Sequence, residues 1–166
     1  MAGTAPPKTR QGSVVGLHGD FRVDVLGTQE SLDLDCGKFY TEYILRCTWI
    51  ERNGTPEIWD VVRRYREFCA IDILLREKYP SRAPLFPYLP SKKYIGSSLS
   101  ADFVDKRQRD LGYYMTSILH SCPLDEIVDS FLDIKRHILE RAREEEQKAA
   151  TETPTGSQNS ATSSFQ

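Results

Sequence analysis

The chain has 166 residues, 39% of them apolar and 28% charged, and a net charge of −2. That length fits one domain with flexible ends and a core that needs no metal or disulfide to hold it together. The slightly acidic balance argues against nucleic-acid binding, and no stretch approaches the ~20 apolar residues that span a bilayer.

The cysteines indicate a reducing compartment. Cys36, Cys47, Cys69 and Cys122 are widely spaced and form no CxxC pair. This pattern is typical of free thiols rather than of a disulfide framework. No apolar run at the N-terminus resembles a signal peptide. We therefore expect a cytoplasmic protein that meets a membrane only from its surface.

The first part of the chain predicts an antiparallel sheet. Residues 20–26 alternate apolar and polar side chains, and residues 39–50 are rich in aromatic and β-branched types. Both patterns are typical of strands, and a loop containing Gly37 joins them. An Asn-Gly pair at 53–54 favours a tight turn, after which residues 57–63 return as a third strand. We expect a three-stranded antiparallel meander.

Helical spacing follows the sheet. Apolar residues over 65–79 recur at intervals of three, four and seven, and the pattern stops at Pro80. Prolines at 84, 87 and 90 then predict an extended segment without helix, because proline fixes φ and removes a backbone donor. Ser100 is positioned to cap a second helix that ends before Pro123.

The remaining chain predicts a helical end and two disordered termini. A short helix is expected near residues 124–131, continuing to about residue 150. We divide the chain into a disordered segment at 1–17, a folded domain at 18–137, a C-terminal helical extension at 138–150 and a disordered tail at 151–166. The predicted fold class is α+β, with the meander packed on a helical subdomain.

Basic residues gather in the middle of the sequence. Residues 60–110 carry 11 Lys or Arg against 7 Asp or Glu, although the whole chain is acidic. This predicts one surface that faces an anion, and charge alone is equally compatible with solvated helix faces.

The most informative stretches are RRYREF at 63–68, PLFPYLPSKK at 84–93 and FVDKR at 103–107. A phosphorylated ring needs cations at several points, and Arg offers a planar fork where Lys offers a point charge.

This ordered set resembles the phox-homology (PX) domain family over residues 20–135. The shared features are an RRYxxF stretch, a proline-rich loop ending in LPxK, and an Arg four residues before a helical Leu. The resemblance implies a PX-like fold and recognition of phosphatidylinositol 3-phosphate. It further implies that Arg64 binds the 3-phosphate, Tyr65 supports the inositol ring, Lys92 contacts the 1-phosphate and Arg107 bonds the 4- and 5-hydroxyls. Neighbouring cations are expected to give general electrostatic support: Arg63, Arg66, Lys93, Lys106 and Arg109.

An apolar tip is expected beside the cationic pocket. Tyr94 and Ile95 directly follow the basic pair at the end of the proline segment. An aromatic or apolar tip at this place adds hydrophobic anchoring to headgroup recognition. Leu85, Phe86 and Tyr88 could share that role or pack beneath the proline loop.

The resemblance implies a non-catalytic module that recruits its owner to early endosomal or related membranes for trafficking or sorting. We expect no cofactor, no nucleic-acid partner and a monomer, with trafficking proteins as further partners. The sequence leaves open whether this is a small sorting-nexin-like protein or a fragment of a longer one.

Each site residue also has a purely structural interpretation. Arg64 could form an ion pair at the helix start, and Tyr65 could belong to the core. Lys92 and Arg107 could be ordinary solvated charges on a loop and on a helix.

The chain also has a feature of a protein-interaction adaptor, and it has no clear feature of an enzyme. A protein-interaction adaptor is the alternative, because the prolines at 84, 87 and 90 match the minimal motif that SH3 domains read. A projecting proline ridge would favour that alternative. An enzyme is disfavoured, because His18, His120 and His137 show no catalytic or metal-binding spacing.

Overall fold

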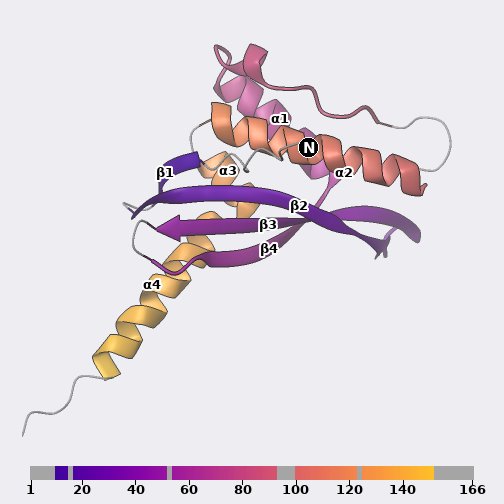
Figure 1. Ribbon diagram of the computed structural model, residues 1–166. Coiled ribbons are helices and arrows are strands. Elements are labelled where there is room, and N and C mark those ends of the chain that lie inside the picture. The colour runs from indigo at the N-terminus through magenta and orange to yellow at the C-terminus, as the bar shows by residue number, and fades with distance from the viewer. Residues whose placement is uncertain (1–9, 15–16, 52–53, 93–99, 123–124, 152–166) are drawn as a thin grey trace, which may run out of the picture.

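The computed structural model describes residues 10–14, 17–51, 54–92, 100–122 and 125–151. The elements are β1 (Arg10–Val14), β2 (Leu17–Asp33), β3 (Lys38–Glu51), β4 (Glu57–Arg64), α1 (Tyr65–Lys78), the 3-10 helix η1 (Ala83–Leu85), α2 (Ala101–Ser121), α3 (Glu126–Leu132) and α4 (Ile134–Thr151). The strands form an antiparallel sheet in the order β1-β2-β3-β4. Helices α1 and α2 lie over one side of this sheet, and α4 projects away from it (Figure 1).

The three predicted strands are present as β2, β3 and β4, with helices after them. β2 and β3 form a long hairpin whose register runs from Gly19 opposite Glu51 to Asp33 opposite Lys38. β2 therefore extends well beyond the predicted 20–26, because backbone pairing with the start of β3 continues where the apolar alternation has faded. Gly37 takes the left-handed conformation with φ 66, which closes the turn at the hairpin tip.

The N-terminal segment corrects the expectation of disorder over part of its length. Residues 10–14 form β1, which pairs with the start of β2 from Arg10 opposite Phe21 to Val14 opposite Leu17. A short strand held by its backbone ladder needs no hydrophobic alternation of its own. The composition of this segment therefore gave no strand signal.

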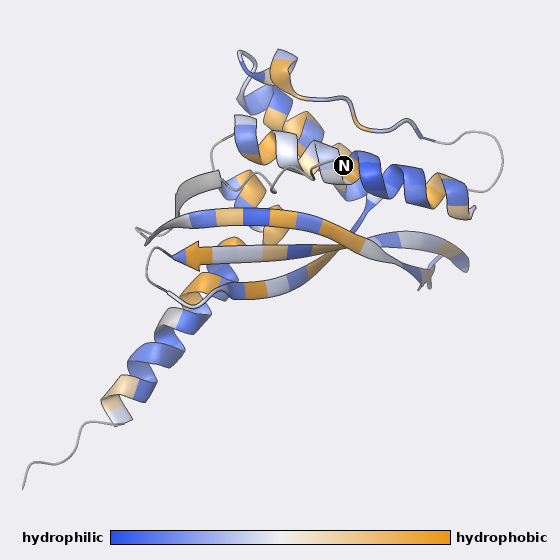
Figure 2. Cartoon of the chain, viewed as in Figure 1, coloured by the Kyte–Doolittle hydropathy of each residue, from blue (hydrophilic) through white to orange (hydrophobic). Residues whose placement is uncertain are grey.

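Apolar side chains from the sheet and the helices form one core. Along β3, Tyr43, Leu45 and Cys47 alternate toward the helices and are at most 1% exposed. The same alternation appears as bands of hydropathy along the strands, whereas α4 becomes mostly hydrophilic away from the sheet (Figure 2). Trp59 links β4 to the C-terminal helices, since its Nε1 donates to the Leu132 carbonyl at 2.8 Å. Within the described ranges, no helix combines the length and apolarity needed to cross a bilayer.

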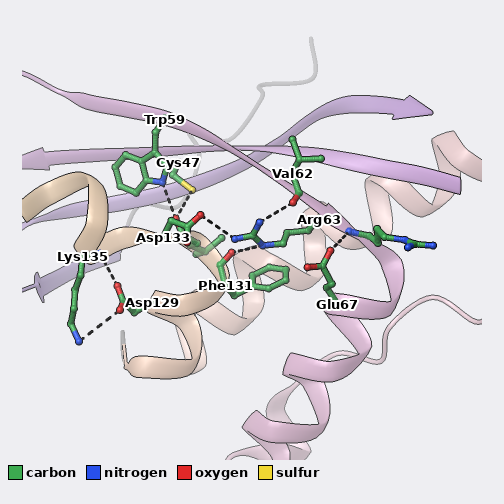
Figure 3. A network of polar contacts seen from close by, with 11 residues as sticks. Cys47, Trp59, Val62, Arg63, Glu67, Asp129, Phe131, Asp133 and Lys135 are labelled. Carbon is green, nitrogen blue, oxygen red and sulfur yellow. Dashed lines mark hydrogen bonds and ion pairs between the residues drawn. The ribbon is translucent and has the colours of Figure 1, made fainter. Parts of the chain in front are cut away.

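α3 and α4 are separate helices, so the expected continuous helix from 124 to about 150 is wrong. The break falls at Asp133, which is left-handed with φ 52. After it, the Lys135 N–H donates to Asp129 Oδ1 at 2.7 Å. Arg63 from β4 stabilises the break: its Nε donates to the Phe131 carbonyl at 2.8 Å, and its Nη2 lies 3.2 Å from Asp133 Oδ2 (Figure 3). The change of direction lets apolar residues on both helices reach the core.

Between α1 and α2, η1 is followed by residues 86–92 without regular secondary structure. The expectation of a wholly helix-free segment is wrong at η1, where Pro84 lies in the first turn and no backbone donor is needed. Arg76 on α1 holds this segment, since its guanidinium donates to the carbonyls of Ala83 at 3.1 Å and Pro87 at 3.0 Å. The segment is thereby held against α1.

Candidate anion-binding site

A hollow of about 150 Å³ lies where the start of β3, the start of α1 and α2 meet. Its lining comprises Phe39, Tyr40, Thr41, Tyr43, Arg64, Tyr65, Arg66 and Arg107. Three guanidinium groups and four aromatic rings thus surround it, and no carboxylate belongs to the lining. Such a surface suits an anionic polar ligand that also offers a flat ring, because guanidinium forks match phosphate oxygens.

Arg64 is positioned by the junction of β4 and α1. It keeps an extended backbone (φ −83, ψ 154) and occupies the N-cap of α1. Its backbone N–H donates to Glu67 Oε2 at 2.6 Å, which fixes the helix start (Figure 3). Its guanidinium carbon lies 3.4 Å from the centroid of the Tyr40 ring, and its Nη1 lies 3.5 Å from Asp33 Oδ2. The predicted phosphate-binding cation therefore faces the hollow while it is paired with a carboxylate from the β2–β3 hairpin.

Tyr65 and Arg107 meet at the wall of the same hollow. The Arg107 guanidinium carbon lies 3.9 Å from the Tyr65 ring centroid and 4.2 Å from that of Phe103. Arg107 Nη2 donates to the Ser91 carbonyl at 3.0 Å, and the Tyr65 hydroxyl donates to the Pro90 carbonyl. Only 7% of Arg107 is exposed, so its interpretation as a solvated helix charge is wrong.

Two buried polar atoms on the lining residues lack partners. The Tyr43 hydroxyl and Arg107 Nε have no hydrogen-bond partner within the described part of the chain. Burial raises the pKa of Tyr43, and the nearby Arg107 guanidinium opposes that rise. The wall of the hollow thus places a buried phenol next to a buried guanidinium group.

Lys92 is not part of the lining. Its side chain is exposed, and it directly follows Ser91, whose carbonyl accepts from Arg107. The chain therefore places this lysine near the rim rather than inside the hollow. Tyr94 and Ile95, the expected membrane-inserting pair, lie outside the described residues.

Sequence reasoning missed several residues of this site. Tyr40 stacks on Arg64, Asp33 pairs with it, and Tyr43 lines the wall. Arg66, expected only as general support, belongs to the lining. For Tyr43 the aromatic run at 39–43 was the available signal, because alternate residues of a strand share one face and Tyr43 shares its face with Phe39. Tyr40 lies on the opposite face of that strand, so alternation gave no signal for it. Asp33 gave no comparable signal.

Carboxylates around Arg64 remain ionised. A hydrogen bond from the Asp35 backbone N–H lowers the pKa of Asp33, and Arg64 acts in the same direction. Hydrogen bonds from Gln29 and Ser31 lower the pKa of Glu42, again with a contribution from Arg64. Among the described residues, no group of His, Cys, Asp and Glu side chains is arranged to hold a metal ion.

Comparison with known proteins decides the family. The PX domain family matches residues 51–135. The chain belongs to the PX domain family. A designed CISK-PX domain solved by X-ray crystallography is 30% identical with a TM-score of 0.53, over 67% of this chain and 97% of that one. The mouse SNX19 PX domain, solved with a bound sulphate ion, has the same fold at 24% identity and a TM-score of 0.55, over 69% of this chain and 97% of that one.

Sorting nexins are among the curated relatives of this PX domain. Sorting nexin MVP1 of Candida albicans is 37% identical over 76 residues, which are 45% of this chain and 10% of that protein. Mouse sorting nexin-13 is 33% identical over 86 residues, which are 51% of this chain and 9% of that protein. The chain thus matches about a tenth of the length of these relatives. The family match supports phosphoinositide binding in general terms.

Proposed function

We propose that this PX domain binds phosphatidylinositol 3-phosphate in the hollow at the start of α1, and so attaches its owner to early endosomal or related membranes. One observation carries the proposal: Arg64 and Arg107, 43 positions apart in the sequence, converge with Tyr65 on a single hollow. Arg66 adds a third guanidinium. Two separated cations beside an aromatic ring are what a phosphorylated inositol requires.

Each residue then has a distinct role. Arg64 binds the 3-phosphate through its planar fork, and Tyr65 supports the inositol ring. Arg107 turns from the Tyr65 face toward the 4- and 5-hydroxyls, which favours a ring without phosphate at those positions. Lys92, at the rim, contacts the 1-phosphate that joins the headgroup to the lipid. Since Arg107 exchanges a cation–π contact worth about 1 kcal/mol or more for these bonds, we expect modest affinity for the headgroup alone.

The surroundings support a lipid partner over an SH3 domain. Pro87 and Pro90 are half-buried, and their carbonyls accept from Arg76 and Tyr65. Phe86 between the prolines is 4% exposed. Pro84, Leu85 and Tyr88 are exposed, but Pro87 and Pro90, which the motif also needs, are held at their carbonyls and only half-accessible to a proline-binding groove. The protein acts as a monomer on the cytoplasmic side of the membrane, and trafficking proteins are its further partners.

The test is a liposome pelleting panel that covers every phosphoinositide isomer. The parent chain should pellet with phosphatidylinositol 3-phosphate in preference to the other isomers, and Arg64→Ala should abolish that binding without unfolding the domain. Arg136→Ala is the matched control, because it removes the same charge from an exposed position on α4. Retained binding by Arg64→Ala, or equal losses in both variants, would remove the pocket assignment.

A further inference from the structure

Asp33 is held rigidly at the end of β2. Its Oδ1 accepts from the Asp35 backbone N–H at 3.1 Å, and its carbonyl accepts from the Gly37 N–H at 2.7 Å. The side chain is 23% exposed. The hairpin turn thus uses one carboxylate oxygen and leaves the other available to Arg64.

That other oxygen faces the cation of the proposed phosphate site. Asp33 Oδ2 lies 3.5 Å from Arg64 Nη1, while the Tyr40 ring covers the guanidinium at 3.4 Å. The Arg64 side chain is 20% exposed. Hydrogen bonding within the turn keeps Asp33 ionised, and Glu42 also lies within electrostatic range of Arg64. An incoming anion therefore meets a cation that already has an anionic partner.

We propose that Asp33 is a specificity-determining residue. Its carboxylate competes with incoming anions for Arg64, so that phosphomonoesters displace it and singly charged headgroups do not. The inference rests on the proposed function, because it concerns the same Arg64 site. It explains how the site would discriminate against the abundant anionic lipids of a membrane. The proposed function states only which phosphoinositide isomer the site prefers.

The selection follows from charge. A phosphomonoester carries about −1.5 to −2 charges at neutral pH and offers three strong acceptor oxygens. A carboxylate carries one charge and two oxygens, so a monoester has the advantage in a direct exchange for a guanidinium. The phosphodiester of phosphatidylinositol or phosphatidylserine carries only one charge and gains little by displacing Asp33. A group that penalises wrong ligands more than the right one raises specificity at some cost in affinity.

The hairpin offers a matched pair of variants. Asp33→Asn keeps the shape of the side chain and its turn-forming oxygen but removes the charge that pairs with Arg64. Asp35→Asn removes one charge from the same turn, where the side chain is exposed and makes no ion pair within the described ranges. The two variants have equal net charge, so any difference between them reports the contact with Arg64.

The experiment measures dissociation constants for vesicles of phosphatidylcholine that contain phosphatidylserine, phosphatidylinositol or phosphatidylinositol 3-phosphate. Asp33→Asn should bind the first two about threefold to fivefold more tightly than Asp35→Asn does, as expected for the loss of a partly exposed ion pair. Its preference for the 3-phosphate over phosphatidylinositol should fall. Equal affinities in the two variants, or an unchanged preference, would overturn the inference.

A second measurement separates this inference from the proposed function. In an Arg64→Ala background, Asp33→Asn should bring no gain beyond that of Asp35→Asn, because no guanidinium is left to release. A gain that persists there overturns the inference. If the parent shows no phosphoinositide preference, the proposed function fails, yet a gain of Asp33→Asn over Asp35→Asn on phosphatidylserine vesicles still supports competition at Arg64. Equal binding in that case overturns both.

Discussion

The guanidinium of Arg107 lies over the ring of Tyr65, 3.9 Å from its centroid, and 4.2 Å from the centroid of the Phe103 ring. A long cationic side chain is thereby almost completely buried in contact with two aromatic rings. Cation–π contacts of this kind hold the charge in place before a ligand binds, and the proposed function requires the guanidinium to leave the Tyr65 face when it bonds the headgroup. The same residue ties α2 to the proline segment through the Ser91 carbonyl. Arg107 is therefore both a structural and a proposed binding residue.

Arg107→Ala should weaken binding to phosphatidylinositol 3-phosphate by about tenfold or more, because hydrogen bonds to a charged group contribute about 1.5–3 kcal/mol. Discrimination against isomers with phosphate at position 4 or 5 should also weaken. Liposome pelleting across the isomers measures both effects. Arg136→Ala, at an exposed position on α4, removes the same charge and serves as the control. Identical lipid profiles for Arg107→Ala and the parent would contradict the assigned role.

The sequence allowed the strand-to-helix junction and the site on it to be predicted in large part. The RRYREF stretch lies where strand periodicity gives way to helical periodicity, so the position of Arg64 and Tyr65 follows from local pattern alone. The stack of Phe103 on Arg107 was also accessible, since residues four apart on a helix are neighbours. The resemblance to a known family joined these local features into one site.

The remaining features depend on pairing over long distances. Asp33 meets Arg64 only because β2 continues to the hairpin tip, and its length is set by backbone pairing rather than by apolar alternation. The helix break at Asp133 has a similar origin. Asp tolerates the left-handed region only moderately, and the bonds from Arg63, which is 70 positions earlier, help to hold the break. Partners so far apart in the chain cannot be predicted from local sequence patterns.

Asp133→Ala should lower the free energy of unfolding by about 1 kcal/mol more than Asp133→Asn does. Both variants lose the ion pair to Arg63, but Asn tolerates the left-handed conformation at φ 52 whereas Ala meets a steric penalty of about 1–2 kcal/mol. The midpoints of urea unfolding compare the two variants directly. Equal midpoints would show that the strain at this position is relieved by a shift of the backbone.

Asp125 should link stability to acid pH. Its Oδ1 accepts from the backbone N–H groups of Ile127 at 3.0 Å and Val128 at 3.2 Å, and caps α3. Partial burial raises the pKa of Asp125, but hydrogen bonds from Tyr79 and Lys78 outweigh it and bring the pKa below its ordinary value. The ionised form is thus favoured in the folded state. Its contribution is present above the unfolded pKa of about 4 and is lost as the pH falls through the folded value.

Asp125→Asn should therefore be less stable than the parent by about 1 kcal/mol at pH 7, although Asn can still cap the helix. The difference should shrink as the pH falls below 4 and should vanish once the parent carboxyl is protonated. Urea unfolding at a series of pH values measures it. If the difference in the free energy of unfolding stays constant down to the lowest pH, the destabilisation comes from packing and not from charge. Asp35→Asn, an exposed carboxylate in the hairpin turn, is the control.

Tyr94 and Ile95 should contribute to membrane attachment and not to headgroup recognition. Replacing both with Ser should weaken liposome binding, because apolar side chains at the tip lose their burial in the lipid interface. Binding of a short-chain, soluble phosphatidylinositol 3-phosphate should change little, since that ligand offers no interface.

The two assays together decide the role of this pair. Arg64→Ala is the matched comparison, because it should reduce both kinds of binding to the same extent. If the double Ser variant also loses both kinds of binding to the same extent, the pair belongs to the pocket rather than to the bilayer contact. If replacing the pair weakens binding only when a bilayer is present, the headgroup contacts and the apolar tip must act on the same membrane surface. Since surface cations add about 1 kcal/mol each near anionic lipid, that joint action would convert modest headgroup affinity into stable recruitment.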